Sequence, residues 1–376
     1  MKRVAIVVGT RPEAIKLAPV ARALRARTDL ETRIVATAQH RDLLDQAMAE
    51  VGIVPDIDLD LMRPRQTLPD IAGRCLIALG QTFARERPDY VIAQGDTTTV
   101  WATAQAAHLA RIPFGHVEAG LRSGLPDTPF PEEMNRRIAG LLARHHFCPT
   151  PAARANLLRE GRSAGTIHVT GNTVIDMLLC IARDLPAPSR GRRSLLVTVH
   201  RSENVRALPA IAGAIHALLE RYPDLRVLWP IHPNPRLAPA IRGALGAHPR
   251  VDLTRSLPYR AFVRAMRDAR LILTDSGGIQ EEGPALGTPV LVLRGETERG
   301  EAIAAGAARL VGTRADTILP AAIELIEDDA AHRRMADAPS PYGDGRAGER
   351  IAEVIHAFLK EDETVSGRTD GSPAAD

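Results

Sequence analysis

The chain has few aromatic residues and little excess charge. Phe, Trp and Tyr make up 3% of its 376 residues, and 48 Lys and Arg against 45 Asp and Glu leave a formal net charge of +3. Proteins that bind nucleic acid usually concentrate positive charge and offer aromatic rings on which bases stack. The sequence contains no run of five basic residues. These absences argue against a nucleic-acid partner.

Cysteine and long apolar runs are also scarce. Cys75, Cys148 and Cys180 are odd in number and far apart, so they support neither a disulfide framework nor a thiolate zinc site. No set of His, Asp and Glu has the spacing of metal ligands, and we expect no metal. The apolar run at residues 4–8 is too short for a signal peptide or a membrane span. We therefore expect a cytoplasmic protein with no membrane partner.

Lysine is the rarest charged residue. Only Lys2, Lys16 and Lys360 are lysine, and the other 45 basic residues are arginine. Lys16 is the only lysine away from the ends of the chain. A compact ammonium, rather than a forked guanidinium, is needed where space is tight or a charge must be tuned. This predicts a function for Lys16, against the alternative that its side chain simply reaches solvent.

Short β-branched runs alternate with amphipathic stretches along the chain, which indicates parallel sheets with helices on both faces. Strands are predicted at residues 4–8, 33–36, 90–93, 113–117, 145–148 and 167–169, and again at 195–199, 226–229, 251–253, 271–273, 290–293 and 309–311. Helices of the first half are predicted at 13–27, 41–51, 68–86, 98–110 and 133–143.

A segment rich in Pro, Gly and Ser separates the two series of strands. We interpret residues 185–194 as a linker between an N-terminal Rossmann-like domain at 1–184 and a C-terminal one at 195–360. The last helix can pack back on the N-terminal domain, and the tail at 361–376 is expected to be disordered. The predicted fold class is α/β, with two doubly wound domains that face a central cleft.

Polar clusters follow nearly every predicted strand. Ligands of open parallel sheets bind beyond the carboxyl ends of the strands, so these clusters are expected to share one cleft. In the first half the clusters begin at Gly9, Gln39, Gln94, Glu118 and Thr170. In the second half they begin at His200, Pro230, Asp275 and Arg294.

The sharpest local pattern is Asp275-Ser-Gly-Gly-Ile-Gln-Glu-Glu282. A strand that runs into two glycines and then a helix points free N–H groups and a helix dipole at one spot, which suits a diphosphate. Ser276 can add a hydroxyl donor beside Gly277 and Gly278, and Glu282 can accept hydrogen bonds from ribose. The alternative is a tight turn followed by glutamates on a helix surface.

Two common nucleotide signatures are missing. The turn Gly9-Thr-Arg-Pro-Glu13 is not a Gly-x-Gly-x-x-Gly fingerprint, and no acidic residue follows at the ribose position, so a nicotinamide cofactor is not supported. The sequence also lacks the P-loop pattern. We expect no cofactor.

Asp96, Glu118 and Glu132 form the candidate catalytic set. Each follows a predicted strand or lies on the loop after Glu118. Carboxyl groups gathered near one another against a low-dielectric wall acquire separated pKa values, which suits paired acid and base catalysis. A helix cap or a solvated charge is the alternative for each alone. His200 and His232 lie at strand ends, where an imidazole can carry a proton or contact a phosphate.

Several motifs occur in order between residues 3 and 357. They include Gly9-Thr-Arg-Pro-Glu-Ala-Ile-Lys16, Gly95-Asp-Thr-Thr-Thr99, His116-Val-Glu-Ala-Gly-Leu-Arg122, Phe130-Pro-Glu-Glu-Met-Asn-Arg136, His200-Arg-Ser-Glu-Asn204 and Asp275-Ser-Gly-Gly-Ile-Gln-Glu-Glu282. Together they resemble the motifs of the non-hydrolysing UDP-N-acetylglucosamine 2-epimerases. The resemblance implies a glycosyltransferase-B-like pair of Rossmann-like domains, a homodimer and a role in cell-envelope polysaccharide biosynthesis.

The resemblance further implies that UDP-N-acetylglucosamine and UDP-N-acetylmannosamine are interconverted without metal or nicotinamide. In the family, UDP is eliminated to leave bound 2-acetamidoglucal and is added back after protonation on the opposite face of C2. By matching position, the resemblance assigns catalysis to Asp96, Glu118, Glu132, His200 and Lys16. It assigns substrate binding to Arg11, Arg136, His232, Ser276, Gly277, Gly278, Glu282 and Arg299.

Bacterial members of this family bind a second, activating UDP-N-acetylglucosamine. The matching positions here are Gln39, His40, Arg65, Gln66 and Arg201. At the effector site, Asp42 stands where the family usually has Gln or Glu. Ser202 and Gly300 also depart from the residues usual in the family, and these two departures leave room for a related UDP-2-acetamido sugar as substrate. The sequence also leaves open a glycosyltransferase with the same fold, a hydrolysing epimerase and a UDP-sugar sensor without catalysis.

Overall fold

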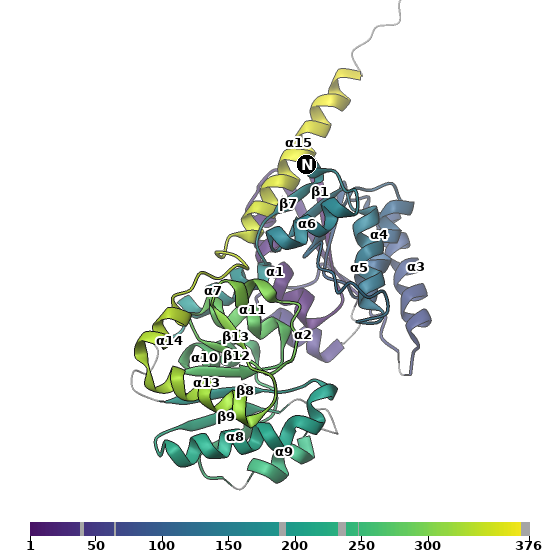
Figure 1. The fold of residues 1–376 in the computed structure, drawn as a ribbon. Coiled ribbons are helices and arrows are strands. Elements are labelled where there is room, and N and C mark those ends of the chain that lie inside the picture. Colours follow the sequence, from purple (N-terminus) through teal and green to yellow (C-terminus); the bar gives the residue numbers. More distant parts are fainter. Residues whose placement is uncertain (38–40, 64, 188–192, 232–237, 247, 370–376) are drawn as a thin grey trace, which may run out of the picture. The chain divides into compact units, whose positions relative to one another are not determined.

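The computed structural model describes residues 1–37, 41–63, 65–187, 193–231, 238–246 and 248–369 (Figure 1). The chain forms two compact units. Unit 1 combines Met1–Met177 with Gly343–Asp376, and unit 2 is Leu178–Tyr342. By sequence, we placed the end of the first domain at residue 184 and counted the last helix with the second domain, from which it can pack back on the first. The change of unit instead falls inside a helix, and the C-terminal segment groups with unit 1.

Unit 1 is built on a seven-stranded parallel sheet in the order β3-β2-β1-β4-β5-β6-β7. Its strands are β1 (Lys2–Val8), β2 (Leu30–Ala36), β3 (Ile57–Asp58), β4 (Tyr90–Gln94), β5 (Phe114–Val117), β6 (His145–Cys148) and β7 (Ile167–Val169). The central strands are apolar along their whole length because both of their faces are buried. The strand order reverses between β1 and β4, and such a reversal opens the ligand-binding end of a doubly wound sheet.

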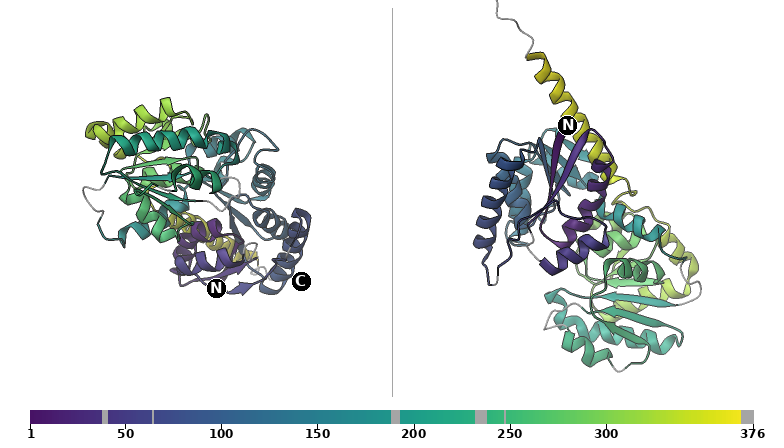
Figure 2. Two further views of the ribbon diagram at one scale, coloured as in Figure 1. Left: turned by 90° about the horizontal axis from the view of Figure 1, so that it is seen from below. Right: turned by 180° about the vertical axis from the view of Figure 1, so that it is seen from behind.

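Helices cover both faces of this sheet (Figure 2). The helices of unit 1 are α1 (Arg11–Arg25), α2 (Arg41–Glu50), α3 (Leu68–Glu86), α4 (Thr98–Leu109), α5 (Glu132–Leu142), α6 (Pro151–Arg159), η1 (Ala164–Thr166), α7 (Thr173–Arg183), which runs on into unit 2, and α15 (Ala347–Thr369). Helix α1 packs against α2 and α15, whereas α3, α4 and α5 pack in a row.

Helix α15 brings the end of the chain back to unit 1. A Cβ at Gly348 would come within 2.8 Å of the backbone of Pro19 in α1, so the two helices touch closely. Phe358 packs edge-on against the rings of Tyr90 and His145 in the sheet. The backbone is helical to Thr369, so the tail expected to be disordered from residue 361 is helical up to that point. No proline interrupts the helix, and residues 370–376 lie outside the described part.

Unit 2 repeats the architecture with a six-stranded parallel sheet in the order β10-β9-β8-β11-β12-β13. Its strands are β8 (Ser194–Thr198), β9 (Arg226–Pro230), β10 (Val251–Thr254), β11 (Leu271–Thr274), β12 (Val290–Val292) and β13 (Ala308–Leu310). The helices are η2 (Ser202–Ala207), α8 (Leu208–Arg221), α9 (Ala238–Leu245), α10 (Tyr259–Asp268), α11 (Gly277–Ala285), α12 (Gly300–Ala304), α13 (Ala315–Glu327) and α14 (Asp329–Ala336). The strand order here reverses between β8 and β11.

The predicted α/β class with two doubly wound domains is confirmed. Each predicted strand overlaps an observed strand, and the two-residue β3 is the one that the sequence pattern missed. The central cleft stays a prediction. None of the described helices is long and apolar enough to cross a membrane.

Candidate active site

The reversal between β1 and β4 gathers candidate catalytic residues from three segments of unit 1. Lys16 lies one turn into α1, Asp96 follows β4 and Glu118 follows β5. Arg11 begins α1 at the same edge and is half-buried. The carboxyl ends of these parallel strands meet at one edge of the sheet, as the sequence predicted.

Glu118 receives two hydrogen bonds on one carboxylate oxygen. Lys16 Nζ donates to Oε2 at 2.5 Å, and Gln94 Nε2 donates to the same atom at 2.8 Å. The backbone of Glu118 has a φ of +64°, in the left-handed region that residues with a Cβ rarely adopt. Such a conformation costs on the order of 1–3 kcal/mol and persists where the surroundings impose it, often at functional sites. The structure therefore brings Lys16 and Glu118 into direct contact.

Asp96 pairs with a guanidinium instead. Arg136 of α5 forms an ion pair with the Asp96 carboxylate, and Asn135 Nδ2 donates to the Asp96 carbonyl oxygen at 3.0 Å. Burial raises the pKa of Asp96 above its ordinary value, and the nearby Glu118 adds to the rise, whereas Arg136 and Lys16 oppose it. A carboxyl group whose pKa is raised toward neutrality is suited to exchanging a proton.

The start of α5 presents two adjacent carboxylates with different surroundings. Glu132, the predicted residue, is half-buried, and among the described residues its side chain makes no hydrogen bond or ion pair. Glu133 is fully buried and accepts hydrogen bonds from Arg137 Nε at 2.8 Å and from the N–H of Ser123 at 3.1 Å. Glu133 also lies 3.4 Å from Arg136 NH1. Glu133 thus fixes the Arg136 guanidinium that pairs with Asp96. The sequence reasoning missed Glu133.

A second missed residue is Glu13, whose side chain is 2% exposed. Its carboxylate accepts from the N–H groups of Gly9 at 2.5 Å and Thr10 at 3.3 Å, and from Thr97 Oγ1 at 2.6 Å. Burial raises the pKa of Glu13 to about 7, although these hydrogen bonds act to lower it. The signal was present in the sequence, because Thr10-x-x-Glu13 around Pro12 is a capping box.

Gly9 is required by close packing rather than by a ligand. A Cβ at this position would lie 2.2 Å from Thr99 Oγ1 and 2.7 Å from Thr37 Oγ1. The absence of a side chain lets the turn after β1 approach α4. This approach is what allows Glu13 to reach Thr97, the N-cap of α4.

In unit 2, the reversal between β8 and β11 brings His200 and Asp275 together. His200 Nδ1 lies 2.9 Å from Asp275 Oδ1. Burial acts to raise the pKa of Asp275, but the hydrogen bond and charge of His200, with donors from Arg201 and Asn204, bring the pKa below its ordinary value. The sequence reasoning proposed His200 and treated Asp275 only as the start of a motif.

The Ser-Gly-Gly turn begins helix α11. Ser276 is the N-cap residue, and Gly277 and Gly278 form the first turn. A Cβ at Gly278 would meet only Glu282 Oε1, at an ordinary 3.6 Å, so the fold itself does not demand glycine there. The missing side chain leaves the N–H groups of the helix start uncovered, as a bound diphosphate would need.

The segment after β12 is tied to α11 by two side-chain contacts. Arg299 Nε donates to Glu281 Oε1 at 2.6 Å, and Thr297 Oγ1 donates to Gln280 Oε1 at 2.6 Å. Glu282, the predicted ribose acceptor, receives a hydrogen bond from Tyr259 Oη at 3.1 Å. The predicted binding residues Ser276, Glu282 and Arg299 therefore belong to one connected region of unit 2.

The predicted effector residues are only partly described. Gln39 and His40 lie outside the described residues, as does the substrate-binding candidate His232. Arg65 is exposed with a φ of +58°, and Gln66 Oε1 accepts from the N–H of Arg63 at 3.2 Å. Arg201 donates to the Asp275 carbonyl oxygen at 3.1 Å. The effector site stays a prediction.

A family model described as UDP-N-acetylglucosamine 2-epimerase matches residues 22–356. The chain belongs to this family. It is 44% identical over 368 residues to the UDP-N-acetylglucosamine 2-epimerase of Escherichia coli (strain K12), which covers 94% of this chain and 98% of that relative. The resemblance predicted from the motifs is confirmed, and the chain is a member of a family of enzymes.

Solved structures agree over nearly the whole chain. The S. aureus MnaA–UDP co-structure is 41% identical with a TM-score of 0.86 and covers 96% of this chain and 97% of its own. UDP-GlcNAc 2-epimerase from Neisseria meningitidis bound to UDP-GlcNAc is 39% identical with a TM-score of 0.85. The match covers 95% of this chain and 100% of that one. The kitacinnamycin glycosyltransferase, at 17% identity and a TM-score of 0.66, covers 95% of this chain and 98% of its own and shares the fold alone.

Proposed function

We propose that the protein interconverts UDP-N-acetylglucosamine and UDP-N-acetylmannosamine by eliminating and re-adding UDP through bound 2-acetamidoglucal. The observation that carries the proposal is the cluster of Asp96, Glu118, Lys16 and Arg136 at one sheet edge. In elimination, a carboxylate takes the C2 proton, the C1–O bond to UDP breaks and a C1–C2 double bond forms. Re-addition returns a proton to the opposite face of C2. Two proton-carrying groups are therefore needed.

The two units divide this work. In unit 1, Asp96, Glu118 and Glu132 transfer protons, and Lys16, Arg11 and Arg136 stabilise the sugar and the negative charge that develops on it. In unit 2, His200 assists the departure of UDP. The nucleotide is bound by Ser276, Gly277, Gly278, Glu282, Arg299 and His232. The relatives whose structures contain UDP and UDP-GlcNAc support this choice of ligand.

Deuterium incorporation tests the proposal directly. The enzyme is incubated with UDP-N-acetylglucosamine in deuterated water, and the recovered sugar nucleotides are examined by NMR. We expect both UDP-sugars to carry deuterium at C2. Turnover without a C2 label would refute the elimination mechanism.

The same incubation separates the alternative activities. A hydrolysing epimerase releases free N-acetylmannosamine and UDP, which anion-exchange chromatography resolves. A glycosyltransferase leaves the sugar nucleotide intact until an acceptor is added. A UDP-sugar sensor binds the nucleotide and turns nothing over. A related UDP-2-acetamido sugar as the true substrate would show itself by faster turnover than UDP-N-acetylglucosamine.

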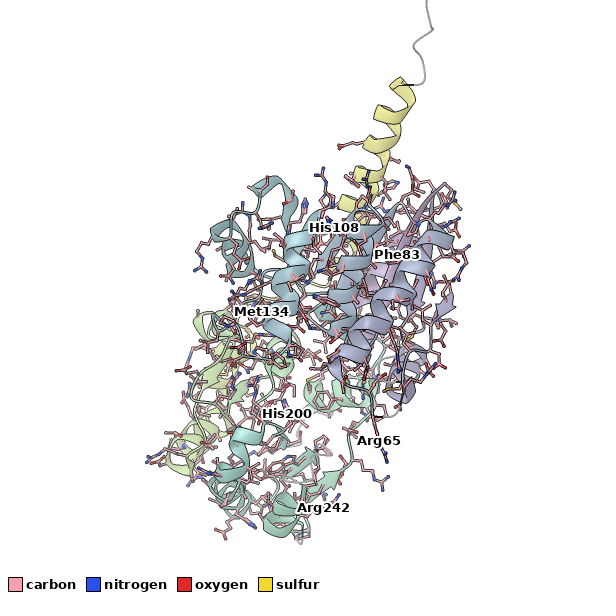
Figure 3. The ribbon with its side chains drawn as sticks, turned by 90° about the vertical axis from the view of Figure 1, so that its right-hand side faces the viewer. Arg65, Phe83, His108, Met134, His200 and Arg242 are labelled. Carbon is pink, nitrogen blue, oxygen red and sulfur yellow. The ribbon has the colours of Figure 1, made fainter. Side chains whose placement is uncertain are left out.

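We propose in addition that the chain forms a homodimer through the outer face of α3 and α4. Ile77 on α3 is 64% exposed and Leu109 on α4 is 73% exposed. They line a hollow of about 700 Å³ that Phe83 also borders; Figure 3 labels Phe83 on α3 and His108 on the neighbouring α4. Exposed apolar groups that gather in this way are typical of protein interfaces.

Light scattering coupled to size exclusion tests the homodimer. The variants Ile77→Asp and Leu109→Asp should each shift the mass toward that of the monomer. Val54→Asp is the matched control, because Val54 is equally exposed but does not line the hollow. A monomeric wild-type protein, or a control that dissociates as readily, would overturn the proposal.

A further inference from the structure

Asp275 and His200 form a pair in which one partner is buried and the other is accessible. The Asp275 side chain is 0% exposed, whereas that of His200 is 38% exposed. The 2.9 Å contact joins His200 Nδ1 to a carboxylate oxygen. An ionised carboxylate only accepts hydrogen bonds, so in this contact Nδ1 carries the proton. Nε2 is then the nitrogen that carries no proton in the neutral ring.

The carboxylate of Asp275 is itself held in place from several directions. Oδ2 accepts from the N–H of Arg201 at 3.1 Å and from Asn204 Nδ2 at 2.9 Å. The N–H of His200 lies 3.1 Å and 3.2 Å from the two oxygens. Asn204 Nδ2 also donates to the carbonyl of Leu293 at 3.2 Å, next to the end of β12. The carboxylate cannot rotate without losing these bonds, so it fixes the imidazole in one orientation.

The position of this pair in the fold links it to the nucleotide site. Asp275 ends the segment from β11, and the next residue, Ser276, is the N-cap of α11. His200 follows the neighbouring strand β8. The same turn therefore carries both the group that orients His200 and the helix start assigned to the diphosphate. A change in the orientation of the imidazole would occur beside the leaving group.

We propose that Asp275 is a positioning residue that holds His200 as the Nδ1–H tautomer and so presents Nε2 to the departing UDP. As the C1–O bond breaks, its electron pair stays on the phosphate oxygen, and the His200 imidazolium gives its Nε2 proton to that oxygen. Re-addition returns the proton to Nε2, so no net proton is consumed. Asp275 stabilises the imidazolium through Nδ1–H and touches neither substrate nor reacting atoms. The role of Asp275 in catalysis rests on the proposed function, whereas the Nδ1–H tautomer of His200 does not.

The tautomer is measured first, on the full-length wild-type protein with ¹⁵N-labelled histidine. Long-range ¹H–¹⁵N spectra are recorded in mildly alkaline buffer, and His200→Gln assigns the signals. We expect a protonated Nδ1 and an unprotonated Nε2 on His200. A protonated Nε2 in this neutral ring would overturn the proposal, and this measurement needs no variant of Asp275 that folds.

Asp275→Asn then tests the catalytic part. The amide NH₂ can donate to Nδ1, which favours the Nε2–H tautomer. We expect kcat to fall by roughly 10²- to 10⁴-fold, as when the wrong tautomer is imposed in Ser-His-Asp enzymes, while the Kd for UDP changes only a few-fold. In the His200→Gln background, Asp275→Asn should have little further effect on kcat. An unchanged tautomer and kcat, or an equal loss in both backgrounds, would refute the positioning role.

Asn204→Ala serves as the matched control, because it removes a donor from Asp275 without touching the imidazole. It should lower the unfolding midpoint and leave the His200 tautomer and most of kcat intact. If it changes the tautomer as strongly as Asp275→Asn does, the carboxylate acts only through the local fold and the proposal fails. A wild-type protein that shows the expected tautomer but never epimerises UDP-N-acetylglucosamine would instead refute the proposed function.

Discussion

Unit 1 and unit 2 both place their candidate functional residues at the strand ends where the strand order reverses, but the residues at those ends differ in chemistry. In each sheet the chain starts at a central strand, and the strand order reverses once, between β1 and β4 or between β8 and β11. The edge of unit 1 carries ion-paired carboxylates, whereas the edge of unit 2 carries a glycine turn, a helix start and a histidine. The topology thus locates a site, and the residues at the strand ends decide what the site does.

The buried carboxyl groups show the same contrast in their pKa values. In unit 1, burial outweighs the donors and raises the pKa of Asp96 and, to about 7, that of Glu13. In unit 2, the imidazole and the N–H donors outweigh burial and lower the pKa of Asp275. The balance between burial and nearby donors and charges thus has opposite signs for Asp96 and Asp275.

The largest expected effect separates proton transfer from nucleotide binding. Asp96→Asn should lower epimerisation by roughly 10²- to 10⁴-fold, because the amide cannot exchange the C2 proton. The Kd for UDP should stay within a few-fold of the wild-type value. NMR of C2 deuteration and calorimetry with UDP measure the two quantities. Near-normal turnover would exclude Asp96 from proton transfer, and Asp316→Asn, an exposed residue of unit 2, is the control.

The next prediction concerns nucleotide binding by the Ser-Gly-Gly turn of unit 2. In Gly278→Ala, a methyl group would cover the start of α11, and losing a hydrogen bond to a charged phosphate would raise KM by roughly 10- to 100-fold. Steady-state kinetics should show a much smaller change in kcat. Gly213→Ala in α8 is the matched control, because a Cβ there meets nothing within 4 Å. Equal behaviour of the two variants would remove the phosphate role from this turn.

A smaller effect is expected from the missed residue of unit 1. Glu13→Gln leaves at least one buried donor without its acceptor, which should lower the free energy of unfolding by about 1–3 kcal/mol. In the wild type, the raised pKa of Glu13 adds stability below pH 4.5 that is lost as the pH rises toward 7. Urea unfolding at several pH values should show this slope in the wild type and its loss in the variant. An identical slope in both proteins would contradict the prediction.

The most graded effect is acid sensitivity. Burial lowers the pKa of His116 and of His145, both in unit 1, to about 4. Because the unfolded chain binds protons first, their contribution to stability is complete above pH 6.5 and is lost as the pH falls toward 4. Hydrogen exchange between these pH values should show unit 1 opening more than unit 2. Equal opening of both units would argue against this assignment.

The sequence predicted the sheets well because central parallel strands are continuous apolar runs with polar ends. It missed β3, which has two residues and no pattern. It also did not single out Glu133, because neighbouring residues on a helix face different directions and only the packing shows that Glu133 points inward. The contact of Glu13 with Thr97 and that of Asp275 with Asn204 join residues more than 70 positions apart. No local pattern contains that information.

Helix α15 has a consequence for how the protein is made. Since it packs on α1, unit 2 is inserted within unit 1 in the order of synthesis. A ribosome that adds about 5–20 residues per second needs roughly 15 to 65 seconds to travel from the end of α1 to the start of α15. During that interval one face of α1 has no covering helix, and by its end all of unit 2 has been made. Unit 1 is therefore completed only after unit 2 has been synthesised.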